Sequence, residues 1–304
     1  MREVRHVPVL LDQVLAAVDP RPGQTIVDCT LGLGGHSAEL LKRINPGGRL
    51  IAIDFDAANI ERARPVLEAI GGTFVLHHNN FAALPTVLAA EGIEQVEGIL
   101  ADVGVASPQI DDPSRGFSYR RPGPLDMRMD PSRGQPASVF VNRMTQRELA
   151  DAILELGDET DAPQIARLIV ERRKLKPIET TQELTRIVCD ARDFTLQRAA
   201  GAKLHPAART FQALRMLVNR EPANLQRLLD VAPHCLRPGG RIAVISFHSG
   251  EDRLVKQSFR DNRRAGVYRD TADDPVVATE AEQRANPRSR SAKLRRAVRS
   301  ERGS

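Results

Sequence analysis

Apolar and polar positions alternate in two rhythms along the first hundred residues of the chain. Short apolar runs, each of the length of a buried strand, lie at 24–29, 49–54, 73–77 and 98–103. Amphipathic, helix-like segments separate them at 37–44, 57–70 and 81–91. Strands that alternate with helices are typical of a parallel, doubly wound sheet, whose right-handed crossovers place helices on both faces. We therefore predict a Rossmann-like α/β fold.

The alternation stops after residue 107. Residues 108–133 are rich in Pro, Gly, Asp and Arg and predict a long loop, and such loops in compact proteins are mostly functional or disordered. Capping boxes at Thr145 and Thr180 then open two helices. The α/β pattern returns with helices at 207–219 and 223–232 and a strand at 241–246. We predict a discontinuous α/β domain of residues 1–107 and 207–304, with residues 108–206 as a mostly helical insertion.

Composition excludes several classes of protein. The chain of 304 residues has no Trp and two Tyr, so its core must be mainly aliphatic. It has no run of about 20 apolar residues, as a membrane-spanning helix needs, and residues 1–6 lack the apolar centre of a signal peptide. Its cysteines (Cys29, Cys189 and Cys235) are scattered and odd in number, which argues against a disulfide framework and for a cytoplasmic location. Cys-His spacing typical of zinc is absent, so no metal is predicted.

Basic residues are concentrated at the C-terminal end. The net charge of +5 favours an anionic partner, and residues 284–302 hold eight Lys or Arg against one acid, Glu301. One reading is a solvated tail. The other is a closing edge strand at 292–299, whose arginines hinder aggregation and contact phosphate.

Glycines are crowded between the first strand and the first helix of the α/β pattern. Gly32, Gly34 and Gly35, followed by His36, form a G-x-G-G turn, and Asp54 ends the next strand. Strand, glycine turn, helix and acidic strand end form the layout of a nucleoside site, in which the carboxylate accepts hydrogen bonds from ribose. The dinucleotide pattern has a third glycine, so the shorter pattern favours S-adenosylmethionine as the ligand. The alternative is an ordinary tight turn.

Polar residues also follow the fourth strand, where Asp102 precedes Ser107 and Pro108. The carboxyl ends of such strands carry the chemistry of α/β enzymes. An exocyclic base amine is a poor nucleophile until hydrogen-bond acceptors hold its N–H groups, and Asp102 with the Ser107–Pro108 turn can supply acceptors. The alternative, that Asp102 only binds cofactor or caps the next turn, stays open.

A second polar group follows the strand at 241–246. His248 lies between Ser246 and Ser249, next to Phe247, and these neighbours favour a role at the substrate. The alternative is a structural histidine, with Ser249 as the N-cap of a helix at 251–260.

Aromatic and basic residues are interleaved in the long loop. Phe117, Tyr119, Arg120, Arg121 and Arg128 suit an unstacked base and its phosphates. The alternative is a loop anchored by Phe117 and solvated by its arginines.

The cysteines bear on which atom of a cytosine is methylated. Methylation of ring carbon 5 needs a thiolate that attacks the pyrimidine ring, and none of the cysteines is well placed for that attack. Methylation of nitrogen is therefore favoured over methylation of ring carbon.

Together these motifs resemble one known family. The matching blocks lie at 6–11, 34–37, 52–54, 102–109, 111–112, 115–118, 123–130, 205–213, 245–249, 251–253 and 286–291. In order and content they are similar to the bacterial small-subunit ribosomal RNA N4-cytosine methyltransferases, the MraW or RsmH family. The blocks span nearly the whole chain.

The resemblance implies a class I methyltransferase sheet with an inserted helical domain, and S-adenosylmethionine as the cofactor. The implied reaction is methylation of N4 of cytidine 1402 (usual rRNA numbering) in the P-site decoding region of 16S rRNA. The implied cofactor contacts are Gly34, Gly35, His36, Asp54, Phe81, Asp102 and Gln109. We predict Asp102, Ser107 and His248 as catalytic residues, and Pro108, Phe117, Tyr119, Arg120, Arg128, Ser246, Arg288 and Arg290 as RNA contacts.

Two other functions compete with this one. An NAD-dependent dehydrogenase needs a third glycine and a second mononucleotide-binding half, and neither is present. A ribosome-assembly factor without activity has no need of the glycine turn or Asp54. Whether the partner is free 16S rRNA or the small ribosomal subunit, and whether the protein forms a homodimer, stays open.

Overall fold

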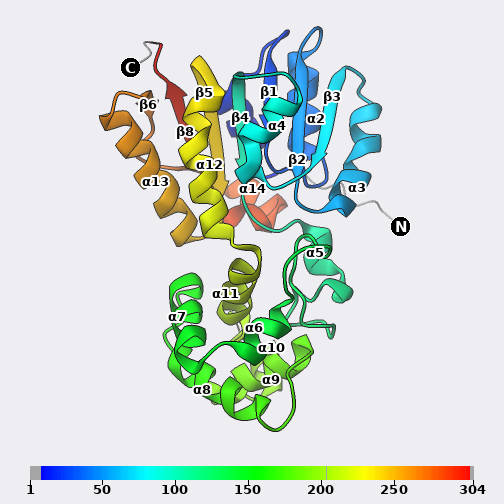
Figure 1. Ribbon diagram of the computed structural model, residues 1–304, viewed down its shortest axis with the longest axis vertical. Coiled ribbons are helices and arrows are strands. Elements are labelled where there is room, and N and C mark those ends of the chain that lie inside the picture. The colour runs from blue at the N-terminus through cyan, green and yellow to red at the C-terminus, as the bar shows by residue number, and fades with distance from the viewer. Residues whose placement is uncertain (1–7, 203, 302–304) are drawn as a thin grey trace. The chain divides into compact units, whose positions relative to one another are not determined.

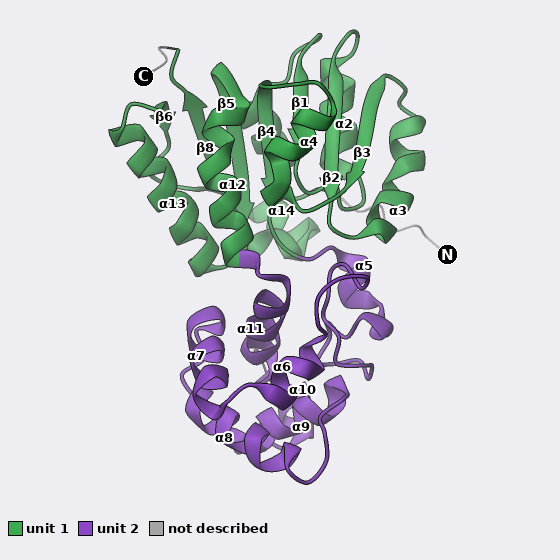
Figure 2. Cartoon of the chain, viewed as in Figure 1, with its two compact units in different colours: residues 1–104, 222–304 green, residues 105–221 purple. Residues whose placement is uncertain are grey.

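The computed structural model describes residues 8–202 and 204–301 and divides the chain into two compact units. Unit 1 holds residues 1–104 and 222–304, and unit 2 holds residues 105–221 (Figure 2). The sequence placed these boundaries at 107 and 206. The second one differs because helix α11 (Ala208–Asn219) packs against helix α7 (Gln146–Gly157) inside unit 2.

Unit 1 is built on an eight-stranded sheet in the order β3-β2-β1-β4-β5-β8-β6, with β7 paired to β8 (Figure 1). The strands are β1 (Thr25–Asp28), β2 (Arg49–Asp54), β3 (Thr73–His78), β4 (Val96–Asp102), β5 (Leu236–Ser246), β6 (Tyr268–Thr271), β7 (Val276–Val277) and β8 (Lys293–Arg299). The first five are parallel, as predicted, whereas β6, β7 and β8 run antiparallel to their neighbours.

Helices cover both faces of the sheet. The helices of unit 1 are α1 (Leu11–Val18), α2 (Gly35–Ile44), α3 (Ala57–Glu68), α4 (Leu84–Ala90), α12 (Glu221–Cys235), α13 (Ser249–Arg264) and α14 (Glu280–Ala285), with short 3-10 turns η1 (Phe81–Ala83) and η3 (Pro287–Ser291). Ile26, Leu50 and Leu100 pack with α1, α2 and α3, while their neighbours Val27, Ile51 and Ile99 pack with α4, α12 and α13. This alternation is the period of two along a strand, and it buries each strand on both sides.

The C-terminal strand corrects one prediction. One of the two readings of residues 292–299 was an edge strand, and the other was a solvated tail. The strand forms, as β8, but it lies between β5 and β6 and not at the edge of the sheet. Its Arg295 is buried and donates from Nε to Asp252 Oδ1 of α13 over 2.6 Å. An interior strand with a buried, paired arginine joins the C-terminal end of the chain to the core of unit 1.

Unit 2 is a cluster of helices around its own apolar core. Its elements are α5 (Ser107–Asp111), η2 (Pro113–Arg115), α6 (Ala137–Arg143), α7, α8 (Ala162–Arg173), α9 (Thr181–Ala191), α10 (Leu196–Ala200) and α11. Apolar pairs four residues apart, such as Leu149 with Ile153 and Ile165 with Ile169, place one stripe of each helix in that core. Both predicted capping boxes form, at Thr145 on α7 and at Thr180 on α9.

Candidate active site

The glycine turn between β1 and α2 has the backbone that glycine permits. Gly32 and Gly34 have φ of 52° and 81°, in the left-handed region, and Gly34 is the N-cap of α2. A Cβ on Gly35 would lie 2.6 Å from Cγ of Pro8, and one on Gly34 would lie 3.1 Å from Cβ of Ala63. Within unit 1, the turn therefore needs glycine for its conformation and packing.

Asp54 holds this turn from the end of β2. Its Oδ2 accepts a hydrogen bond from the amide of Gly32 over 2.7 Å, and its Oδ1 accepts one from the amide of Asp56 over 2.8 Å. Burial raises the pKa of Asp54 to about 6, although these hydrogen bonds oppose the rise. Each carboxylate oxygen can accept more than one hydrogen bond, so Asp54 keeps capacity for a ribose hydroxyl.

Asp102 lies at the point where the strand order reverses. Strand β1 is followed in the chain by β2 on one side and pairs with β4 on the other, so the ends of β1 and β4 flank the switch point. Ligands of open α/β sheets bind at such points. The structure thus places Asp102, at the carboxyl end of β4, where the sequence predicted chemistry.

A buried acid on β1 supports this corner, and the sequence analysis missed it. Asp28 is fully buried, and its Oδ2 accepts a hydrogen bond from Ser37 Oγ over 2.7 Å. Its Oδ1 accepts one from the amide of Thr30 over 3.0 Å, and Thr30 Oγ1 in turn accepts one from the amide of Asp102 over 2.6 Å. Burial raises the pKa of Asp28. The available signal was its position, because Asp28 ends a strand just before the glycine turn.

His36 joins the glycine turn to Asp102. Its Nε2 lies 2.9 Å from the carbonyl oxygen of Val9, which can only accept, so Nε2 carries a proton. Its Nδ1 lies 3.7 Å from Asp102 Oδ2. The other oxygen, Asp102 Oδ1, is buried and has no hydrogen-bond partner among the described residues.

The charges around Asp102 shift its titration. Burial raises the pKa of Asp102 to about 6, His36 opposes this rise, and the acids Asp28 and Glu251 add to it. The side chain as a whole is 24% exposed, although Oδ1 itself is buried. Asp102 therefore combines an unpaired acceptor atom with an elevated pKa.

His248 begins α13, which corrects the prediction for its neighbour Ser249. The side chain of His248 accepts from the amide of Glu251 and is the N-cap of α13, the role expected of Ser249. Glu251 is 2% exposed, and its Oε2 accepts a hydrogen bond from the amide of Phe247 over 3.1 Å. Its Oε1 lies 2.8 Å from Nε2 of His248, but out of line for a hydrogen bond. A structural role for His248 is thus visible, and its catalytic role remains a prediction.

The remaining predicted cofactor residues lie in different units. Phe81 opens η1 after β3 and packs against the core of unit 1. Gln109 is buried in α5 of unit 2, where its Oε1 accepts a hydrogen bond from the amide of Ala106 over 2.9 Å. Ser107 and Pro108 are the first two residues of the same helix and are partly exposed.

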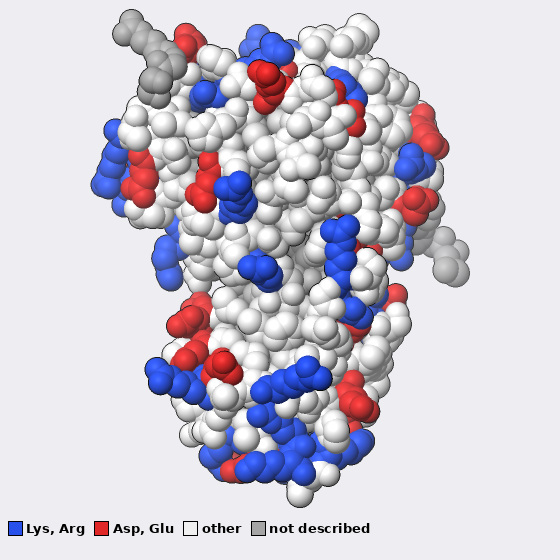
Figure 3. All heavy atoms as spheres, viewed as in Figure 1, with Lys and Arg blue, Asp and Glu red and all other residues white. Residues whose placement is uncertain are grey.

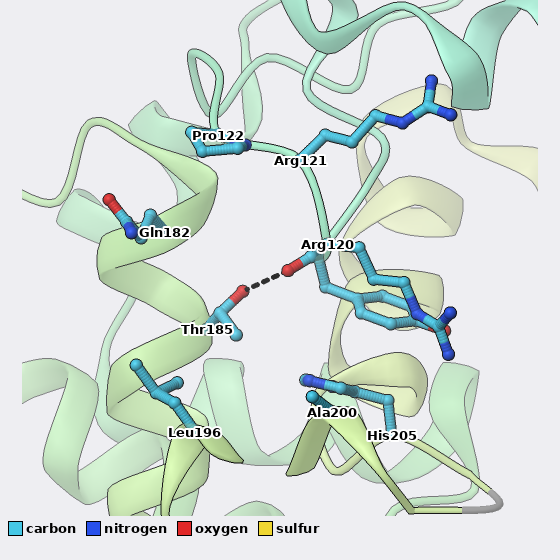
Figure 4. Close-up of a pocket in the computed structure, with 9 residues that line it drawn as sticks. Arg120, Arg121, Pro122, Gln182, Thr185, Leu196, Ala200 and His205 are labelled. Atoms are coloured by element: carbon cyan, nitrogen blue, oxygen red, sulfur yellow. Dashed lines mark hydrogen bonds between the residues drawn. The ribbon is translucent and has the colours of Figure 1, made fainter.

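Of the predicted RNA contacts in the long loop, some pack in the core of unit 2 and others line a pocket. Phe117 lies in the core of unit 2, as the alternative reading expected. The ring of Tyr119 stacks on His205 with centroids 4.5 Å apart, and Arg120 lies over Tyr119. Tyr119, Arg120 and His205 line a pocket of about 310 Å³ with residues of α9 and α10 (Figure 4).

Other predicted RNA contacts have structural partners or lie on the surface. Arg128 forms a two-pronged pair with Asp126, with distances of 2.8 and 2.7 Å. Ser246 is buried at the end of β5 and offers no surface to RNA in this structure. Arg288 and Arg290 are exposed on η3. In unit 2, Lys and Arg crowd the lower end of the view in Figure 3, and exposed basic residues of that unit include Arg167, Lys176 and Arg198.

Metal-binding clusters and membrane-spanning helices are both absent from residues 8–202 and 204–301. No group of three or more His, Cys, Asp or Glu side chains there is arranged to hold a metal ion. No helix in the described part of the chain combines the length and apolar character needed to cross a membrane.

Comparison with known proteins gives full-length matches. Curated proteins named ribosomal RNA small subunit methyltransferase H are 44% identical in Symbiobacterium thermophilum (98% of both chains), 46% in Nitratidesulfovibrio vulgaris (97% of this chain, 85% of that one) and 43% in Acidobacterium capsulatum (98% and 99%). A solved O-methyltransferase from Thermotoga maritima aligns over all of this chain and 71% of its own, but at a TM-score of 0.43 and 10% identity it is too distant to add to the argument.

The family model of the MraW methylases matches residues 3–300. This match confirms the predicted methyltransferase and its predicted cofactor, S-adenosylmethionine. The chain belongs to the MraW methylase family.

Proposed function

We propose that this protein transfers a methyl group from S-adenosylmethionine to N4 of cytidine 1402 in the decoding region of 16S rRNA. The observation that carries the chemistry is Asp102 Oδ1, a buried acceptor atom without a partner at the switch point of the sheet. The ribosomal substrate is supported by relatives named ribosomal RNA small subunit methyltransferase H, with at least 43% identity over nearly the full chain.

The residues around the glycine turn fit the methyl donor. Within unit 1, Gly34, Gly35 and His36 would hold it from the start of α2, Asp54 would accept from its ribose, Phe81 would contact its base, and Asp102 would complete the site. Gln109, in α5 of unit 2, stays a contact that the family resemblance predicts. Asp54 and Asp102 are carboxyl groups at the carboxyl ends of β2 and β4, the two parallel strands on either side of β1, and negative charge there suits a sulfonium cation. When bound, the donor supplies an electrophilic methyl group.

The amine of cytosine needs an acceptor before it can attack. Its nitrogen lone pair is delocalised into the ring, and a hydrogen bond from N4–H to a fixed carboxylate favours the pyramidal nitrogen that attacks. Asp102 Oδ1 is such an acceptor, held by the Thr30 hydrogen bond to its backbone. Positioning and exclusion of water would supply most of the rate enhancement.

The cysteines support attack by nitrogen. Methylation of ring carbon 5 needs a thiolate, but burial raises the pKa of Cys29 well above its usual value and that of Cys235 to about 11. Cys189 is also buried with a raised pKa. All three are therefore thiols at neutral pH, which disfavours covalent attack on the pyrimidine.

Unit 2 would recognise the RNA. The pocket beside Tyr119 offers an aromatic ring, the guanidinium of Arg120 and the hydroxyl of Thr185, which suits an unstacked base and its phosphate (Figure 4). Burial and the charge of Arg120 lower the pKa of His205, so its ring is neutral at physiological pH and adds to the stacking surface. Arg288 and Arg290 of unit 1 would add phosphate contacts.

Mass spectrometry of 16S rRNA tests the proposal. RNA from a deletion strain should lack the N4-methyl group at position 1402, and the wild-type gene should restore it. The Asp102→Ala gene should restore none, whereas Asp274→Ala, which changes an exposed acid of unit 1, should restore it fully. Methylation by Asp102→Ala at the wild-type level would refute the role of Asp102.

A binding measurement separates the competing functions. Thermal stabilisation by S-adenosylmethionine and not by NAD is expected. Stabilisation by NAD alone would favour a dehydrogenase, and stabilisation by neither would favour an assembly factor without activity. Methylation assays on free 16S rRNA and on assembled small subunits then identify the physical form of the substrate.

A further inference from the structure

The side chains of His36 and Asp102 face each other without forming a hydrogen bond. Since the Val9 carbonyl fixes a proton on Nε2, a neutral His36 turns the lone pair of Nδ1 toward Asp102 Oδ2, 3.7 Å away. Two acceptors that face each other at this distance repel when Asp102 is ionised. One proton placed on either partner converts the repulsion into attraction.

Apart from His36, the charged groups that face Asp102 in the described structure all favour the protonated form of Asp102. Asp28 on β1 and Glu251 on α13 are buried carboxyl groups whose negative charge disfavours ionisation of Asp102. Asp28 also interacts electrostatically with His36, which follows the glycine turn. No Lys or Arg of the described residues is among the groups that shift the titration of Asp102. The corner therefore lacks one positive charge.

We propose that, at mildly acidic pH, Asp102 holds a proton on the side that faces Nδ1 of His36. It releases this proton when the cationic methyl donor binds, and it takes up a proton from the amine after methyl transfer. The inference rests on the proposed function, because it assumes that the donor lies beside this pair. A sulfonium beside Asp102 supplies the missing positive charge, so the proton is no longer held. The binding of a proton and of a cation at one corner are then mutually exclusive.

The charges balance over the whole cycle. The lone pair of N4 forms the bond to the methyl carbon, and the bond from that carbon to sulfur breaks with its electrons on sulfur, which becomes a neutral thioether. The positive charge now lies on N4, and its proton passes to Oδ1 of Asp102, the atom without a partner. Below about pH 6 Asp102 keeps this proton, as in the free protein, and above that pH it passes the proton to solvent; a neutral product leaves in both cases. His36 acts here as a positioning residue, through Asp102.

The charge difference between donor and product makes the inference measurable. S-adenosylmethionine and S-adenosylhomocysteine share their adenosine, amino and carboxyl groups and differ in the charge on sulfur. Because the pKa of Asp102 is about 6, the affinity for the cationic donor should fall about tenfold for each pH unit below 6. The affinity for the neutral product should follow only the groups that the two ligands share.

Isothermal titration calorimetry of the full chain with both ligands tests this inference. Titrations from pH 5 to 8, in pairs of buffers with different ionisation enthalpies, give the number of protons released. The donor should release about half a proton more than the product at pH 6, close to one more at pH 5, and none more at pH 8. Equal proton release by the two ligands, or a ratio of their dissociation constants that is constant with pH, would overturn the inference.

Three variants identify the groups involved, and their effects have different signs. Asp102→Asn should abolish the extra proton release. Glu251→Gln removes a negative neighbour and should move the midpoint of the pH dependence downward, whereas His36→Gln removes the opposing partner and should move it upward. Midpoints that stay at the wild-type pH in both Gln variants would contradict the assignment to this pair, even if Asp102→Asn fails to fold.

The outcome for the proposed function is separate. If neither ligand binds the wild-type protein, the proposed function fails and this inference fails with it. If both bind and 16S rRNA is methylated, but the ratio of their dissociation constants is independent of pH, only the release of a proton by Asp102 is refuted.

Discussion

Replacing Asp102 with Asn should stabilise the free protein at neutral pH, although it removes the carboxylate that is proposed to take up the proton of the amine. In the folded protein, burial raises the pKa of Asp102 from 3.8 to about 6, a rise of about 2.2 units. Each unit corresponds to about 1.4 kcal/mol, so ionised Asp102 destabilises the fold by roughly 3 kcal/mol at pH 7. Since the side chain is 24% exposed, solvent reduces this figure toward about 2 kcal/mol.

The sign of the pH dependence follows from the raised pKa. The folded protein binds the proton of Asp102 more tightly than the unfolded chain does, so the stabilising contribution is complete below about pH 4. It is lost as the pH rises through about 6. An Asn side chain does not titrate, so the gain in stability of Asp102→Asn should be largest above pH 7 and should vanish near pH 4.

Urea unfolding followed by far-UV circular dichroism measures this difference from pH 4 to 8, and the lack of Trp makes this signal preferable to fluorescence. Hydrogen exchange of the β1 and β4 amides assigns the change to unit 1, because a chain of two compact units need not unfold in a single step. Asp54→Asn is the matched control. Its pKa is also raised to about 6, but both of its oxygens accept backbone hydrogen bonds, so the Asn amide loses an acceptor and should destabilise. A variant Asp102→Asn that is less stable than wild type at pH 7 would refute this reasoning.

Three further predictions concern packing and RNA. Gly35→Ala should lower stability by about 1–3 kcal/mol in thermal unfolding, because its Cβ would lie 2.6 Å from Pro8 Cγ. Gly201→Ala should be neutral, because its Cβ would make only an ordinary contact, 3.9 Å from the carbonyl oxygen of Arg198. Tyr119→Ala should weaken binding of an RNA fragment that spans the target cytidine roughly 10- to 100-fold, whereas Tyr119→Phe, which keeps the ring, should bind normally; equal affinities of the two variants would exclude stacking. Arg290→Ala should reduce the slope of log K against log salt concentration by about 0.7–0.9, where K is the association constant for the RNA fragment. Arg64→Ala, which changes an exposed residue of α3, is the control. Equal slopes in the two variants would exclude a phosphate contact by Arg290.

The sequence predicted those parts of the fold that depend on residues close together in the chain, such as the limits of strands and the starts of helices. Strand β2 begins and ends where its apolar run does, at Arg49 and Asp54, because a strand buried on both faces needs that run. The capping box at Thr180 marked the start of α9, since its side chain and that of Glu183 satisfy backbone groups within one turn. Neither reading of residues 292–299, solvated tail or edge strand, gave the interior position of β8, because strand order depends on pairing between distant segments, here with β5 and β6.

The candidate site shows the same division. Asp102 and Asp54 were identified because each ends a strand, a feature that is visible in the sequence. Asp28 satisfies the same rule and was overlooked beside the glycines that follow it. The partners of Arg128 and the burial of Ser246 depend on side-chain packing, which hydrophobic patterning does not encode.

Unit 1 holds several buried carboxyl groups, and the binding of a cation explains why they are kept there. Asp28, Asp102 and Glu251 all lie near the ends of β1, β4 and β5, and the first two have pKa values raised by burial. A core selected only for stability would hold apolar or paired groups there, because an ionised carboxylate in such a place destabilises the fold. A binding site for a cation gains from the same charge only while the cation is bound. The expected gain in stability of Asp102→Asn and the expected loss of methylation by Asp102→Ala are therefore two consequences of one buried carboxyl group.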